Sequence, residues 1–216
     1  MSISYPYIFL DFDGVIKESV EIKSDVFESL FLQFGKEVAR RVRRHHEQNG
    51  GLSRYEKLPL YLQWSGLVAS EEQVAEWSDL FSSMVKQRVV DSDWVPGVVD
   101  FLNQKVGKTD LFIVTATPQH EIEEILRELG MAGYFSAVIG APVAKAEAIK
   151  SLLSQFSISA GDAVMIGDTH SDFEAAKSNQ LDFILRRTAL NLESQGKIAC
   201  SMIDDFRGWT GLEGIA

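Results

Sequence analysis

Short apolar segments that alternate with helical patterns constrain this fold more than any other feature of the sequence. Five segments have the length and the apolar run of buried strands, and helical spacing of apolar residues is typical of the stretches between them. Such alternation predicts βαβ units, which build a parallel sheet covered by helices on both faces. The predicted strands are residues 7–12, 111–116, 136–141, 163–168 and 182–187, and the predicted helices include residues 118–130 and 145–156.

Residues 17–90 interrupt the alternation, because they contain no convincing strand. Their apolar residues recur at helical spacing, which predicts a small helical bundle inserted directly after the first strand. The sequence therefore predicts an α/β core domain made of residues 1–16 and 91–216, with residues 17–90 as a separate helical domain. The joins, residues 15–19 and 90–96, are candidate hinges.

Four helices are expected in the insert. The first ends at Gly35, and a very basic second helix follows it. Capping boxes beginning at Ser53 and Ser70 predict the starts of the third and fourth helices. We expect the third to be kinked or interrupted at Pro59, because proline lacks the N–H that the helix ladder needs.

Composition limits the possible functions. The chain has 216 residues, 45% of them hydrophobic, and a net charge of −10. Such an acidic chain repels nucleic acid and anionic membranes unless it carries a local basic patch. The single cysteine, Cys200, excludes an internal disulfide, and we see neither a signal peptide nor an apolar run that could span a bilayer. We expect a cytoplasmic protein.

Polar side chains gather where the predicted strands end: Asp11, Asp13, Thr115, Lys145, Asp168 and, four residues further on, Asp172. Ligands of an open parallel sheet bind at the carboxyl ends of its strands, so these side chains should share one edge. Buried carboxylates are costly unless a partner or a metal compensates them. Carboxylate oxygens suit Mg²⁺, while the hydroxyl and the amine suit a phosphoryl group.

The segments DFDGVI, IVTATP, GAPVAK with its lysine, and GDTHSD resemble the four ordered motifs of the haloacid dehalogenase superfamily. WVPGVVDFL, residues 94–102, is similar to the segment that precedes the second motif there. The helical insert resembles the type-1 helical cap of that superfamily. The resemblance covers nearly the whole chain and implies a Rossmann-like core carrying an inserted α-helical cap.

The same resemblance implies a Mg²⁺-dependent phosphatase that acts on a small phosphorylated metabolite. Asp11 would be the nucleophile that forms an aspartyl-phosphate, which divides a hard hydrolysis into two steps. Asp13 would protonate the leaving alkoxide and then activate water.

The remaining motif residues receive binding roles from the resemblance. The metal would be held by the nucleophile's carboxylate, the backbone carbonyl of Asp13 and the carboxylate of Asp168, while Asp172 would hold the metal's waters or orient Lys145. Thr115, Ala116 through its backbone N–H, and Lys145 would stabilise charge on the phosphoryl group.

Simpler explanations exist for several of these residues. The Asp13–Gly14 pair is also common in turns, and Asp172 could sit near a helix N-terminus only because an acid is favourable there. Lys150 is the alternative to Lys145. We interpret His170 as a loop residue without a role.

The substrate is the least determined part. The glycine-rich loop NGGLSR could present Arg54 to a second anionic group, although Arg54 could equally pair with Glu56 or Glu47. The nearby basic residues and histidines are interpreted as solvent-exposed: Arg40, Arg41, Arg43, Arg44, His45, His46 and Lys57.

Other functions remain open. Asp13 argues against a haloacid dehalogenase and a phosphonatase, in which the second acid of the first motif is not expected. A phosphosugar mutase of the β-phosphoglucomutase type shares the motifs and the cap type, so the sequence does not exclude it. A non-catalytic binding protein with this fold is a further alternative.

Overall fold

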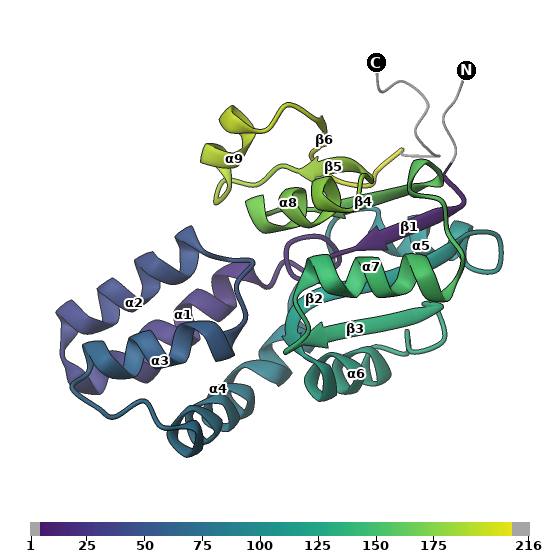
Figure 1. Cartoon of the computed structure of the whole chain (residues 1–216). Coiled ribbons are helices and arrows are strands. Elements are labelled where there is room, and N and C mark those ends of the chain that lie inside the picture. Colours follow the sequence, from purple (N-terminus) through teal and green to yellow (C-terminus); the bar gives the residue numbers. More distant parts are fainter. Residues whose placement is uncertain (1–4, 209–216) are drawn as a thin grey trace.

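A computed structural model describes residues 5–208 of the chain. Its centre is a six-stranded parallel sheet with the strand order β3-β2-β1-β4-β5-β6 (Figure 1). All five predicted strands are present, and the short edge strand β6 was not predicted. The strands are β1 (Tyr7–Leu10), β2 (Asp110–Pro118), β3 (Ala137–Ala141), β4 (Ala163–Gly167), β5 (Asp182–Arg186) and β6 (Ser201–Ile203).

Helices cover both faces of the sheet, so the predicted α/β class is confirmed. Neighbouring strand residues point to opposite faces: Leu10 belongs to the core under α5 and α6, whereas Phe9 belongs to the core under α7 and α8. The helices of this part are α5 (Val98–Lys105), α6 (Gln119–Glu128), α7 (Lys145–Gln155), α8 (His170–Ser178) and α9 (Leu192–Lys197).

Four helices form the insert and lie beside the sheet in Figure 1. Their interior is aromatic, with the rings of Phe27 and Phe81 4.0 Å apart. The helices are α1 (Val20–Phe31), α2 (Lys36–Gln48), α3 (Arg54–Trp64) and α4 (Glu71–Asp91). No helix within residues 5–208 is long and apolar enough to cross a membrane.

Helix ends in the insert follow local sequence chemistry. The Glu56 carboxylate accepts the backbone N–H of Ser53 at 2.9 Å, as the predicted capping box requires. Gly35 adopts a φ of 101° between α1 and α2. The helix α3 runs through Pro59 to Trp64, so it is not interrupted there, and the alternative of a kink at Pro59 stays a prediction.

The two joins between sheet and insert lie side by side and are hydrogen-bonded. The backbone N–H of Val95 donates to the carbonyl of Ile16 at 3.0 Å, and the backbone N–H of Glu18 donates to the carbonyl of Asp93 at 2.9 Å. The buried Lys17 ammonium donates to the Val90 carbonyl at 3.0 Å. The two connecting segments are therefore joined to each other, and any movement of the insert relative to the sheet would bend both together.

Candidate active site

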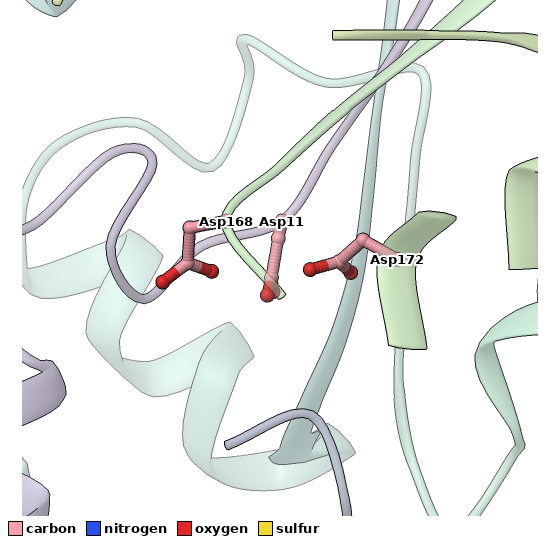
Figure 2. A group of neighbouring side chains, drawn as sticks. All are labelled: Asp11, Asp168 and Asp172. Carbon is pink, nitrogen blue, oxygen red and sulfur yellow. The ribbon is translucent and has the colours of Figure 1, made fainter. Parts of the chain in front are cut away.

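Three buried carboxylates meet at the carboxyl edge of the sheet. Asp11 follows β1, Asp168 follows the neighbouring strand β4, and Asp172 lies in the first turn of α8. One oxygen of each lies within 4.8 Å of the others. Figure 2 shows Asp11 between the other two side chains. The sequence placed all three at this edge, and the sheet order brings them together.

Lys145, the first residue of α7, bridges two of these carboxylates. Its ammonium donates to Asp11 Oδ2 and to Asp172 Oδ1, both at 2.6 Å. Burial lowers the pKa of this ammonium, but the two carboxylates outweigh that effect and raise it. An ammonium at a helix start opposes the helix dipole, and these two partners explain its position. The alternative, Lys150, is exposed on the same helix.

Asp11 combines burial with crowding by like charges. Its Oδ1 accepts the N–H of Phe12 at 2.7 Å. Burial raises the pKa of the Asp11 carboxyl to about 6, with Lys145 opposing the shift and the carboxylates of Asp172 and Asp13 adding to it. A cation at the cluster would favour the ionised, nucleophilic form.

Asp168 carries the clearest sign that the cluster fits a cation. Its buried Oδ1 has no hydrogen-bond partner among the described residues. Burial, followed by the charges of Asp11 and Asp172, raises its pKa well above the ordinary value. A hard divalent cation with oxygen ligands would satisfy this acceptor and stabilise the ionised carboxylates, so the donor set fits Mg²⁺. Gly14 is also tied to this carboxylate, since a Cβ there would lie 2.3 Å from Asp168 Oδ2.

Asp172 is held from two directions. Its Oδ2 accepts the N–H of Thr169 at 3.0 Å and the Thr169 hydroxyl at 2.6 Å, which closes a capping box at the start of α8. Its Oδ1 accepts Lys145. Of the two roles expected for Asp172, the contact with Lys145 is present, and the role toward the metal's waters stays a prediction. His170 is the exposed first residue of α8 and not a loop residue as predicted.

The Asp13 carboxylate lies apart from this cluster and faces the insert. It accepts the Ser19 hydroxyl at 2.5 Å, the Thr117 hydroxyl at 3.0 Å and the Lys23 ammonium. Burial raises the pKa of Asp13, but the Lys23 ammonium and the two hydroxyls outweigh that effect, so the pKa lies below its usual value. This side chain is not part of the carboxylate cluster, and the expected metal contact through the Asp13 backbone carbonyl stays a prediction.

Two of the three expected phosphate-binding residues, Thr115 and Ala116, line the cavity that also contains Asp11 and Asp13, whereas Lys145 lies beside it and contacts Asp11. Thr115 is buried in β2, and its hydroxyl accepts the N–H of Thr117 at 3.2 Å. Ala116 lies between them, and all three line the cavity together with Asp11 and Asp13.

Arg54 has a partner that the sequence did not reveal. Its guanidinium donates to both carboxylate oxygens of Glu121, at 2.8 and 2.6 Å, and both side chains are buried. Glu121 lies on α6, 67 residues away, so the pair joins the insert to the sheet part. Glu56 and Glu47, the partners considered from sequence, contact Ser53 and Arg43 instead. Arg54 lines the cavity, but its charge is already compensated.

Two residues interpreted as solvent-exposed are buried. Lys57 on α3 is 1% exposed and His46 on α2 is 4% exposed, and both line the cavity. The signal was helical spacing: His46 falls four residues after the buried Val42, and Lys57 falls four residues before the buried Tyr61. Lys23 was also missed as a cavity residue.

The sequence model of the haloacid dehalogenase-like hydrolases matches residues 7–185. A curated phosphoglycolate phosphatase from Pseudomonas savastanoi pv. phaseolicola is 23% identical over 180 residues, which are 79% of this chain and 65% of the relative. This chain therefore spans less than two thirds of that protein's length.

Solved structures share the fold at low sequence identity. CbbY from Rhodobacter sphaeroides in complex with xylulose-(1,5)bisphosphate is 18% identical with a TM-score of 0.79, covering 98% of this chain and 99% of that one. β-Phosphoglucomutase from Clostridium difficile is 18% identical with a TM-score of 0.72, covering 93% and 91%.

Proposed function

The chain belongs to the haloacid dehalogenase-like hydrolase family, and we propose that it is a Mg²⁺-dependent phosphatase of a small organic phosphomonoester. The observation that carries the proposal is the pairing of a buried carboxylate cluster around Asp11 with a separate carboxylate, Asp13, across the same cavity. One carboxylate can attack while the other handles protons. The curated relative, named a phosphoglycolate phosphatase, supports this choice of substrate class.

In this mechanism Asp11 attacks phosphorus and forms an aspartyl-phosphate, while Asp13 protonates the leaving alkoxide. In the second step Asp13 takes a proton from the water that cleaves the intermediate. The first step needs Asp13 protonated and the second needs it ionised. The Lys23 contact favours the ionised form, and the proton taken from water restores the acid for the next turnover. Lys145 fixes the orientation of the Asp11 carboxylate and, with Thr115 and the Ala116 N–H, offers positive charge and donors to the phosphoryl oxygens.

Asp11, Asp168 and the backbone carbonyl of Asp13 would hold Mg²⁺, and Asp172 would support them through Lys145. When bound, Mg²⁺ supplies positive charge next to the transferring phosphoryl group. We further propose that residues 17–90 act as a cap over a core of residues 1–16 and 91–216. Lys23, Arg54 and other residues from this segment line the cavity, which supports the proposal.

The test is phosphate release from p-nitrophenyl phosphate and from a panel of phosphorylated metabolites, with and without Mg²⁺. Asp11→Asn keeps the shape of the side chain but removes the nucleophile, so turnover should fall by many orders of magnitude while circular dichroism stays unchanged. A variant that kept a tenth of wild-type activity would show that covalent catalysis through Asp11 is wrong.

A phosphomutase is the alternative, because a β-phosphoglucomutase is among the structures that share the fold. A mutase returns the phosphoryl group to a sugar phosphate, whereas a phosphatase passes it to water. Incubation with hexose phosphates, followed by ³¹P NMR, separates the two: isomerised sugar phosphate without release of inorganic phosphate would favour the mutase.

A further inference from the structure

Lys57 is a buried cation without an anionic partner. It is 1% exposed, and none of the described residues places a carboxylate oxygen within ion-pair distance of its ammonium. Its hydrogen-bond partner is His46, with 3.0 Å between Lys57 Nζ and His46 Nδ1. The other cations lining the cavity are paired, Lys23 with Asp13 and Arg54 with Glu121. A buried, uncompensated ammonium is costly, so its retention needs a reason.

His46 adds an unsatisfied donor beside that cation. Its Nδ1 faces the Lys57 ammonium and therefore accepts, which leaves the proton on Nε2. That Nε2 is buried and has no hydrogen-bond partner among the described residues. Burial, and then the Lys57 and Lys23 charges, lowers the pKa of His46 well below its usual value, so the ring is neutral.

One cavity connects this pair to the catalytic carboxylates. Its lining includes Asp11 and Thr115 on the sheet side and His46 and Lys57 on the insert side. A single ligand in this cavity could therefore contact both the catalytic carboxylates and the Lys57–His46 pair.

We propose that Lys57 and His46 form a subsite for a carboxylate carried by the substrate a short distance from its phosphoryl group. This inference rests on the proposed phosphatase function and specifies its substrate as a short phospho-carboxylic acid. The carboxylate would pair with the Lys57 ammonium and accept a hydrogen bond from His46. Burial makes the contact stronger than one made in water.

The test compares two substrates of equal length, 2-phosphoglycolate and 2-hydroxyethyl phosphate, which differ in the carboxylate. The readout is the ratio of their kcat/KM values. Lys57→Met keeps the side-chain length and removes the charge, and a hydrogen bond to a charged group contributes about 1.5–3 kcal/mol. The ratio should therefore fall by about 10- to 150-fold. Lys36→Met, an exposed lysine on α2, is the matched control and should leave the ratio unchanged.

An unchanged ratio in Lys57→Met, or equal losses for both substrates, would overturn the subsite. Calorimetric binding of both compounds to the Asp11→Asn protein with Mg²⁺ gives a second measurement that needs no turnover and no folded Lys57 variant. Binding of 2-phosphoglycolate at least tenfold tighter supports the subsite, and equal affinities contradict it. If the wild-type protein hydrolyses no phosphomonoester of the panel while the Asp11→Asn protein shows that binding preference, the phosphatase proposal fails and the subsite stands. If the wild-type protein hydrolyses both compounds equally and the Asp11→Asn protein binds them equally, the phosphatase proposal stands and the subsite fails.

Discussion

Replacing Arg54 with methionine tests whether this residue holds the insert against the sheet part or binds substrate. The guanidinium and the Glu121 carboxylate are 4% and 1% exposed, and two hydrogen bonds of 2.8 and 2.6 Å join them. The Ser82 hydroxyl on α4 also donates to Glu121, so this carboxylate of α6 is bound by side chains from both α3 and α4. Arg54→Met leaves this carboxylate buried without its cation.

The magnitude follows from burial. Breaking a buried ion pair by removing one partner costs about 3–5 kcal/mol, whereas an exposed pair contributes about 0–1 kcal/mol. Urea unfolding measures the difference: with a slope of about 2 kcal/mol/M, the midpoint should fall by roughly 1.5–2.5 M. The control is Arg40→Met, which removes an exposed arginine 3.6 Å from Glu37 and should change the free energy of unfolding by less than about 0.5 kcal/mol.

Two further measurements identify the cause. Arg54→Met combined with Glu121→Leu removes both charges, so the double variant should be more stable than Arg54→Met alone. Although burial raises the pKa of Glu121, the Arg54 guanidinium outweighs it and lowers the pKa below the usual 4.5. A lowered carboxyl pKa stabilises the fold above the unfolded value and loses that effect as pH falls through the folded value. The stability advantage of the wild type over the double variant should therefore shrink below about pH 4.5.

Arg54→Met should reduce activity on 2-phosphoglycolate and 2-hydroxyethyl phosphate alike. Unchanged stability, together with a loss confined to 2-phosphoglycolate, would refute the structural role and return Arg54 to the substrate contact expected from sequence.

Three other predictions follow from the site. Activity should disappear in EDTA and return with Mg²⁺, measured as phosphate release; full activity in chelator would contradict a metal at the carboxylate cluster. Asp168→Ala should raise the Mg²⁺ concentration for half-maximal activity more than Asp172→Ala, because Asp168 has the unpartnered oxygen while Asp172 is bonded to Lys145. A Cβ on Gly51 would lie 1.7 Å from Ser171 Oγ and 2.7 Å from its Cβ, so Gly51→Ala must displace the loop between α2 and α3. Such overpacking should lower the free energy of unfolding by about 1–3 kcal/mol, measured by urea unfolding, and an unchanged midpoint would contradict the close contact.

Local chemistry explains which parts could be predicted from the sequence. Asp11 and Asp168 directly follow apolar runs, so strand prediction alone places them at the sheet edge. The Ser53 capping box depends on residues three apart and was recognisable for that reason. The edge strand β6 has three half-buried residues, too few for a periodic signal.

Long-range pairing explains what could not be predicted. Glu121 comes within hydrogen-bond distance of Arg54 only after the insert packs on α6, and no pattern of neighbouring residues in the sequence predicts that contact. Base rates place lysine and histidine on the surface, which misassigned Lys57 and His46. Their positions beside buried apolar residues on amphipathic helices were the better guide, because the helical period decides which face a side chain occupies.

The charges around the cavity fall into two unequal halves. On the sheet side, three carboxylates face one ammonium, Lys145, which leaves a negative excess that a divalent cation would match. On the insert side, the Lys23 and Arg54 charges are paired, which leaves Lys57 as the uncompensated cation among the described cavity residues. Burial, together with the Lys23 ammonium, lowers the pKa of Lys57 to about 7, so near neutral pH the side chain carries only part of its charge while no anion is bound, and a bound anion would favour the charged form.

A substrate anion that reaches Lys57 removes the cost of burying this charge, whereas a phosphomonoester with an uncharged tail leaves the ammonium buried and unpaired. Unpaired buried groups discriminate between ligands more strongly than added attraction does. If the proposed subsite operates, it therefore selects by penalising substrates that lack the carboxylate. The same ammonium would favour closure of the insert over the correct substrate, because only that substrate supplies the missing charge.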